Sequence, residues 1–179
     1  MTPSDATLVT RALEGDRDAF GELVLRHQSA VRRFLRHLAR GDEALADDLA
    51  QDTFVQAWHR LGQFRGDAAF ATWLLGIAHN HWRNARRKQR EVALEAAHLD
   101  ALETVPPAAT ASDLRQDLAQ AMQRLDPDEQ TALHLTYQQG LSHSDIATVL
   151  GWPLGTVKTH LARSKEKLRT LLAAWNPST

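Results

Sequence analysis

Helical periodicity runs along almost all of this 179-residue chain, and no segment alternates apolar and polar residues as a half-buried strand would. Apolar residues recur every three or four positions, and glycines, prolines and capping residues divide this pattern into segments. The segments predict helices at 4–13, 18–39, 43–61, 67–88, 113–124, 127–138, 142–150 and 154–172. We therefore expect an all-α protein.

Residues 91–113 separate the first four predicted helices from the last four. They carry Pro106 and Pro107, several alanines and threonines, and acidic residues without a single Lys or Arg. This composition is typical of a flexible linker, although 91–102 has a marginal helical pattern. We expect two small helical domains, at 1–95 and 113–179, joined by a flexible linker at 96–112.

The charge is nearly balanced, at a formal −1, but it is unevenly distributed. Arg and Lys gather at 26–40, 83–90 and 158–169, whereas acidic residues gather at 42–52 and through the middle of the chain. Opposed patches indicate two kinds of partner. A protein that grips DNA unaided is usually more basic than this one.

Several kinds of site are missing from the sequence. It has no cysteine, which excludes disulfides and cysteine-based zinc sites, and its nine histidines show no ligand spacing. We recognise no glycine-rich phosphate loop, nucleophile elbow or catalytic carboxylate pair, so we expect no enzymatic activity, cofactor, metal or small-molecule substrate. No apolar run is long enough to span a bilayer and no signal peptide is visible, so we expect a cytoplasmic protein.

The segment 140–169 (GLSHSDIATVLGWPLGTVKTHLARSKEKLR) has the layout of a helix-turn-helix. Ser142 and Asp145 form a capping-box pair for its first helix, and the turn at 151–153 leads into the second. On that second helix, Arg163 is placed to contact a guanine edge or a phosphate, and Thr159 a base or backbone oxygen. An ordinary helical hairpin with a solvated basic tail is the alternative.

The predicted helix 43–61 has an acidic face opposite its buried stripe. The face contains Asp48, Gln51, Asp52 and the apolar Val55, and it lacks a compensating Lys or Arg. A solvated helix face is the usual meaning of such a pattern. A carboxylate-rich face with one apolar position also suits docking to a basic helical partner, and helix geometry alone does not decide between the two.

The loop after this helix is aromatic, and the helix that follows is basic on its outer side. The helical wheel places Thr72, Gly76, His79, Asn80, Arg83, Arg87 and Arg90 outward. Basic and amide groups beside aromatic rings suit a single nucleic-acid strand, because charges follow phosphates and rings stack on bases. We expect Phe70 to lie in the core, whereas Phe64 and Trp73 fit either a core or a stacking role.

These residues resemble a known family. DLAQDTF, FRGDAAFATWLLGIAHN and the following Arg pair look like region 2 of the bacterial RNA polymerase sigma factors of the extracytoplasmic-function group. LSHSDIATVLGWPLGTVKTHLARSKEKLR is similar to region 4 of the same group. The two motif sets occur in the expected order with a linker between them. The resemblance implies that 1–95 is region 2, that 113–179 is region 4, and that the partners are core RNA polymerase, promoter DNA and an anti-sigma factor.

The resemblance also implies roles for particular residues. The acidic face would bind the clamp helices of the polymerase largest subunit through Asp48, Gln51, Asp52 and Val55. The −10 element, opened to a single strand, would be bound by Phe64, Arg65, Gly66, Asp67, Phe70, Trp73, Asn80, Arg83, Arg86 and Arg87. The duplex −35 element would be bound by Thr156, Lys158, Thr159, Ala162 and Arg163. Three features depart from the family pattern: His160 in place of a common arginine, Ser164-Lys165 in place of a frequent Ala-Arg pair, and Trp152 in place of a small aliphatic residue.

The expected function is therefore that of an alternative sigma factor, which binds core RNA polymerase and directs promoter-specific transcription initiation under the control of an anti-sigma factor. An autonomous helix-turn-helix transcriptional regulator is the alternative. That alternative leaves the acidic face and the aromatic loop unexplained, and the near-neutral charge argues against strong unaided DNA binding.

Overall fold

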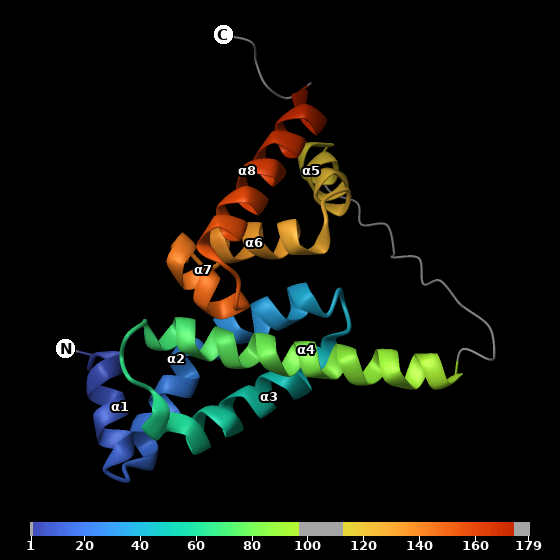
Figure 1. Cartoon of the computed structure of the whole chain (residues 1–179). Helices are drawn as coiled ribbons and strands as arrows, with labels where there is room; N and C mark the ends of the chain where they lie inside the picture. Colours follow the sequence, from blue (N-terminus) through green and yellow to red (C-terminus); the bar gives the residue numbers. More distant parts are fainter. Residues whose placement is uncertain (1, 97–112, 174–179) are drawn as a thin grey trace.

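The computed structural model describes residues 2–96 and 113–173, and within these ranges it contains helices and no strand (Figure 1). The elements are α1 (Asp5–Leu13), α2 (Arg17–Leu38), α3 (Glu43–Arg60), a short 3₁₀ helix η1 (Leu61–Gln63), α4 (Phe70–Ala96), α5 (Asp113–Gln123), α6 (Pro127–Tyr137), α7 (His143–Leu150) and α8 (Leu154–Leu171). The prediction of an all-α protein is confirmed. None of the described helices is long and apolar enough to cross a membrane.

Local sequence signals set most helix boundaries. The side chains of Ser4, Asp16, Asp42 and Ser142 each accept a hydrogen bond from the backbone N–H three residues further on. Each such cap stabilises its helix by about 1 kcal/mol. At the other end of α7, Gly151 adopts a left-handed φ of 66°, which ends the helix.

The end of α4 differs from its prediction. The helix continues to Ala96, past the expected end at Lys88 and through the first part of 91–102, for which the sequence showed a marginal helical pattern. Residues 89–96 include good helix formers, and Arg87 pairs with Glu91 one turn later at 3.8 Å. The remainder of the predicted linker, 97–112, lies outside the described residues.

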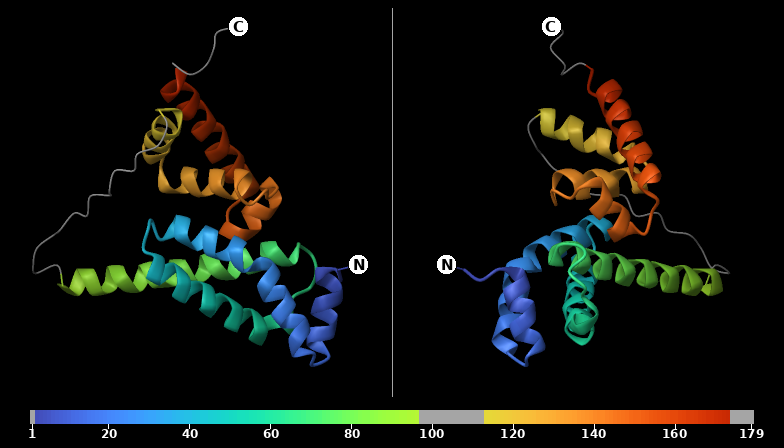
Figure 2. Two further views of the ribbon diagram at one scale, coloured as in Figure 1. Left: turned by 180° about the vertical axis from the view of Figure 1, so that it is seen from behind. Right: turned by 60° about the vertical axis from the view of Figure 1, so that its left-hand side comes forward.

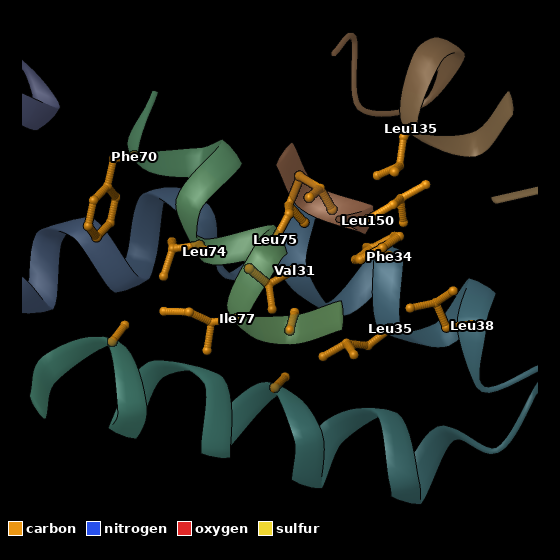
Figure 3. Close-up of a cluster of buried hydrophobic side chains, with 14 of the residues drawn as sticks. Val31, Phe34, Leu35, Leu38, Phe70, Leu74, Leu75, Ile77, Leu135 and Leu150 are labelled. Carbon is orange, nitrogen blue, oxygen red and sulfur yellow. The ribbon is translucent and has the colours of Figure 1, made fainter. Parts of the chain in front are cut away.

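Helices α1–α4 pack around an apolar centre in the N-terminal half of the chain. Helices α2, α3 and α4 contact one another along their buried stripes, which include Val31, Leu35, Leu49 and Leu74. Figure 3 shows several of these side chains converging from α2 and α4. The C-terminal half of α4 extends beyond this bundle and projects away from the other helices (Figures 1 and 2).

Helices α5–α8 form the C-terminal half. Ile146 of α7 and Val157 and Leu161 of α8 are buried where the helix-turn-helix closes on α6. An ion pair also joins α8 to α6, because Lys167 of α8 donates to the buried carboxylate of Glu129 of α6 at 2.9 Å. Helix α8 is thus held on the rest of the C-terminal half by apolar contacts and by this ion pair.

The two halves pack against each other. Helix α7 lies on α4, and α6 contacts α2 (Figures 1 and 2). Leu135 of α6 and Leu150 of α7 join the same buried cluster as Phe34 of α2 and Leu75 of α4 (Figure 3).

This packing corrects the prediction for the outer side of α4. Thr72 and His79, which the helical wheel places outward, are only 1% and 6% exposed, and Gly76 between them is partly covered. The wheel was correct about which residues share a face. It contained no information that a second domain covers that face.

Candidate protein and nucleic-acid interfaces

The acidic face of α3 is open to solvent. Asp48, Gln51 and Asp52 are exposed, and Val55 exposes 58% of its surface. Neither Asp48 nor Asp52 has an ion-pair partner among the described residues, whereas the neighbouring Asp47 lies 3.7 Å from Arg32. The α3 acidic face therefore combines uncompensated carboxylates with an exposed apolar side chain, which is the combination that a basic protein surface would complement.

The loop between α3 and α4 carries exposed polar residues above an aromatic cluster. Arg65, Gly66 and Asp67 are exposed, and Gly66 adopts a left-handed φ of 77° that turns the chain. Beneath them, the ring centroid of Phe64 lies 5.4 Å from that of Phe70 and 5.3 Å from that of Trp73.

The three rings of this cluster differ in exposure. Phe70 is only 3% exposed and also packs on His27, with ring centroids 5.6 Å apart, so it supports the loop from the core and offers no free face to a base. Phe64 and Trp73 are each partly buried. They pack on the core and still present part of their surface, so both of the roles left open from sequence are compatible with their positions.

The basic part of α4 begins one turn after its covered face. Asn80, Arg83 and Arg87 are exposed, while Arg86 is partly buried with its guanidinium carbon 5.4 Å from the ring centroid of Trp82. This cation–π contact holds Arg86 against the helix, and Arg87 pairs with Glu91, whereas Arg83 has no ion-pair partner among the described residues.

A cleft of about 710 Å³ lies beside this basic surface, between α4 and the start of α6. Its lining includes Arg83, Arg86, Arg87 and Arg90 on one side and Asp126 and Asp128 on the other. Sequence reasoning did not single out two further lining residues, Arg40 and Trp82. Arg40 adopts a left-handed φ of 50° at the end of α2, a conformation that is rare for a non-glycine residue and that periodicity does not predict.

The second helix of the helix-turn-helix, α8, presents the residues expected from sequence. Lys158, Thr159, Ala162 and Arg163 are exposed, and Thr156 is partly exposed. The hydroxyl of Thr159 already donates to the carbonyl oxygen of Gly155 at 2.9 Å, so it is available to a ligand as an acceptor.

Two of the departures from the family pattern contact each other. The ring of Trp152, in the turn, lies 5.1 Å from the ring of His160 on α8. Sequence reasoning noted each residue separately and did not pair them. The contact holds His160 and the start of α8 against the turn.

Within residues 2–96 and 113–173, no group of three or more His, Asp or Glu side chains is arranged to hold a metal ion. Three histidines are instead buried or partly buried where the two halves meet. Burial, followed by the charge of Arg83, lowers the pKa of His79 to about 4. Burial, followed by His37 and Arg33, lowers the pKa of His134 to about 3.

Comparison with known proteins adds to this geometry. The family model for Sigma-70 region 2 matches residues 23–92, and that for Sigma-70, region 4 matches residues 115–168. The RNA polymerase sigma-H factor of Pseudomonas aeruginosa is 36% identical over 92% of this chain and 91% of its own length. The ECF RNA polymerase sigma-E factor of Haemophilus influenzae is 33% identical over 92% of this chain and 93% of its own length.

The chain belongs to the extracytoplasmic-function group of the sigma-70 family. The resemblance stated from the sequence motifs is thereby confirmed. A solved structure of the sigma factor RpoE from Bartonella quintana, in complex with the anti-sigma factor NepR, is 28% identical with a TM-score of 0.69. The match covers 86% of this sigma factor and 96% of that chain. A sigma factor is a transcription-initiation factor, so the alternative of an autonomous regulator is not supported.

Proposed function

We propose that this chain is an alternative sigma factor that binds core RNA polymerase through one face of α3 and reads its promoters with two separate surfaces, on α4 and α8. The observation that supports the proposal most directly is the presence in one chain of both sigma-70 regions, in the family's order. In this proposal 1–95 acts as region 2, 96–112 as the linker and 113–179 as region 4.

The polymerase-binding role belongs to the α3 acidic face. Asp48, Asp52 and Gln51 are exposed around Val55, and the two carboxylates have no ion-pair partner among the described side chains. Long, basic or amide side chains of a partner helix can pair with these groups while an apolar residue covers Val55. Charge complementarity of this kind raises the association rate and selects the partner.

The −10 role belongs to the loop and to the basic part of α4. Arg65, Gly66 and Asp67 are exposed next to the partly buried ring of Phe64, and Phe70 supports that ring from the core. A base extruded from the duplex costs a few kcal/mol, which contacts within a polymerase complex offset. Stacking on a partly exposed ring stabilises each base by about 1–3 kcal/mol.

The strand that leaves this loop would continue along α4. Trp73 lies next to Phe64 at the start of the helix, and Asn80, Arg83 and Arg87 follow on its exposed side. Arg86 is held against Trp82 and contributes positive potential near the same path. The arginines pair with phosphates, so this part of the site positions the strand without reading its sequence.

The −35 role belongs to α8. Arg163, Lys158, Thr159 and Ala162 form its exposed face, with Thr156 at the edge. Only Arg163 and Thr159 offer groups suited to base edges, and Lys158 suits a phosphate. A reading surface with few base-specific side chains depends in part on the shape of the duplex.

The proposal includes an anti-sigma factor, a cytoplasmic location beside RNA polymerase, and the absence of catalytic activity of the chain itself. Support for the first comes from the Bartonella quintana sigma factor, which was solved in complex with an anti-sigma factor. The chain has no cysteine, so a thiol signal would have to be sensed by the partner.

Run-off transcription tests the proposed function. Core RNA polymerase, the purified chain and the promoter region of its own operon are combined, and transcripts are mapped to the nucleotide. We expect a transcript that starts at one position and depends on both the chain and the core enzyme. Core enzyme alone is the control. Sequence-specific DNA binding without any polymerase-dependent transcript would contradict the proposal.

A further inference from the structure

The aromatic cluster at the loop before α4 depends on Phe70, the first residue of that helix. The Phe70 ring is 3% exposed, and its centroid lies 5.4 Å from that of Phe64 and 5.6 Å from that of Trp73. Phe64 and Trp73 are the two partly exposed rings of the cluster. The position of Phe70 therefore determines where these two rings lie, because a close-packed ring cannot move without displacing its neighbours.

A histidine of α2 supports Phe70 from below the cluster. The ring centroids of His27 and Phe70 lie 5.6 Å apart, and only 12% of the His27 side chain is exposed. Nε2 of His27 lies 2.8 Å from Oδ2 of Asp5, in the first turn of α1. A carboxylate only accepts hydrogen bonds, so Nε2–H donates, and this bond sets both the orientation of the imidazole and its tautomer.

Asp5 binds two neighbouring residues of α2. Its second oxygen, Oδ1, accepts from Arg26 at 2.6 Å, and Arg26 also donates to Glu22 at 2.9 Å. Arg26 and His27 thus both tie α2 to α1, and His27 adds the ring contact with Phe70. This difference separates a general role in holding α1 from a specific role at the aromatic cluster.

The exposed part of the loop has little to hold it in place. The side chains of Arg65 and Asp67 make no hydrogen bond or ion pair with any other residue of 2–96 or 113–173, and Gly66 lies between them. The position of the loop therefore depends on its two ends, at Phe64 and Phe70. Helix α1 contacts η1, which leads into the first end, and through the imidazole bound to its first turn it also supports the second.

We propose that His27, held by Asp5, is a positioning residue for promoter opening. It fixes Phe70, which in turn holds the rings of Phe64 and Trp73 where an extruded base of the −10 element stacks. The inference rests on the proposed function, and it gives a part in that function to α1 and α2, which carry none of the proposed −10 contacts. Stacking requires close alignment of ring and base, so a displaced ring destabilises the open complex. Initial binding of duplex DNA does not need that alignment.

Three substitutions test this series of contacts. His27→Leu keeps an apolar group against Phe70 and removes the hydrogen bond to Asp5. Asp5→Ala removes the same bond from the other side without touching Phe70, so it carries the test if His27→Leu does not fold. Arg26→Gln is the matched control, because it removes the 2.6 Å bond to Asp5 and leaves His27 in place. Circular dichroism checks the fold of each variant.

Abortive initiation with the full holoenzyme separates the affinity of the initial promoter complex from the rate constant of its opening. We expect His27→Leu and Asp5→Ala to lower the opening rate constant roughly ten-fold, as loss of a hydrogen bond to a charged group predicts. Both variants should keep the initial affinity within about two-fold of wild type, and Arg26→Gln should keep both constants within about two-fold.

Abasic promoters identify the step through which His27 acts. Each non-template nucleotide of the −10 element is replaced in turn by an abasic one, which removes the base and keeps the phosphate. At the position whose base stacks on Phe64 or Trp73, we expect opening by wild type to slow and the difference between wild type and variant to disappear. The two changes then remove one shared interaction, so their effects do not add. A role of His27 in stability alone would keep the difference at every position.

The results that would overturn the inference are distinct from those that would remove the proposed function. Wild-type opening by His27→Leu or Asp5→Ala would overturn the inference, as would a loss confined to the initial affinity. An equal loss in Arg26→Gln would also overturn it, since the attachment of α1 as a whole would then be responsible, and so would a difference that persists at every abasic position. If wild-type protein itself gives no polymerase-dependent transcript, the proposed function fails.

Discussion

His79 and His134 are held in the neutral state by their surroundings. Burial is the main cause for both, and nearby positive charge adds to it, from Arg83 for His79 and from His37 and Arg33 for His134. The backbone of Val149 acts on His79 in the opposite direction. The Nδ1 atom of His79 has no hydrogen-bond partner among the described residues, so a proton there would be a buried charge without an acceptor.

These shifts predict a pH dependence of stability. Each pKa is lower in the folded chain than the usual 6.5, so the unfolded chain binds more protons below that pH. The folded chain therefore has its full free energy of unfolding, as far as these histidines determine it, above pH 6.5. As the pH falls toward 4, each histidine lowers that free energy by roughly 1.4 kcal/mol per pH unit. We expect urea midpoints measured between pH 7.5 and 5 to fall more steeply for wild type than for His134→Gln. Equal slopes would contradict this assignment.

The exposed position of Arg163 on α8 leads to a second prediction. Arg163→Ala should weaken −35-dependent transcription by about 1–3 kcal/mol, because it removes the one exposed guanidinium on the reading face of α8 that is suited to a guanine edge. Arg169→Ala is the matched control, since Arg169 is exposed on the same helix and pairs with Glu166 at 2.9 Å. Transcription is measured on promoters with intact and scrambled −35 elements. An equal loss from both variants would remove the special role of Arg163.

The sequence predicted the position of some aromatic and basic residues and not of others. It placed Phe70 in the core correctly, because a large ring at a buried helical position has few alternatives. It left Phe64 and Trp73 open, and the structure shows why, since both pack on the core and remain partly exposed. Arg40 and Trp82 were missed, because their importance arises from a cleft between segments that are distant in the sequence.

Helix α3 has a buried apolar side and an exposed acidic side. Its buried stripe packs on α2 and α4, whereas Val55 on the α3 acidic face is 58% exposed and neither Asp48 nor Asp52 forms an ion pair within residues 2–96 and 113–173. Substitutions on this face should therefore change binding and leave the fold intact, since surface changes away from such contacts usually alter stability by less than about 0.5 kcal/mol.

We expect Asp48→Lys combined with Asp52→Lys to abolish polymerase binding. The double change replaces two carboxylates by ammonium groups in the centre of the proposed interface, where like charges repel a basic partner. Glu14→Lys combined with Asp18→Lys gives the same change in net charge at exposed positions just after α1 and at the start of α2, and it should bind normally. Binding is measured by pull-down with core enzyme, and circular dichroism checks the fold. Unchanged affinity of the first variant would remove the α3 acidic face from the proposal.

Helix boundaries were predictable where the sequence carries a chemical stop or start. Ser142 with Asp145, and Gly151 at the end of α7, are signals of this kind, and the structure places α7 as expected. The end of α4 carries no such signal, so composition suggested a linker where the helix in fact continues. The covered face of α4 was missed for another reason, because helical periodicity describes one helix and does not report a second domain that packs on it.

For the whole molecule, the distribution of charge matters more than its sum. The net charge is −1, yet five arginines line the cleft between α4 and the start of α6, and none of the exposed carboxylates of α3 lines that cleft. The chain therefore cannot rely on overall attraction to DNA, and it gains specificity by presenting each patch to a separate partner. Polymerase binding brings the promoter-reading surfaces to DNA that they would not hold alone.

This balance predicts weak, salt-sensitive DNA binding by the free chain. If α8 alone engages a −35 duplex and neutralises two or three phosphates, affinity should fall roughly 10- to 40-fold between 50 and 200 mM salt. Fluorescence anisotropy with the free chain, and then with holoenzyme, measures both cases. We expect Arg163→Ala to lower the salt slope by about one and Arg169→Ala to leave it nearly unchanged. Nanomolar, sequence-specific binding by the free chain at 200 mM salt would contradict this prediction, because it would show that the chain reads promoters without polymerase.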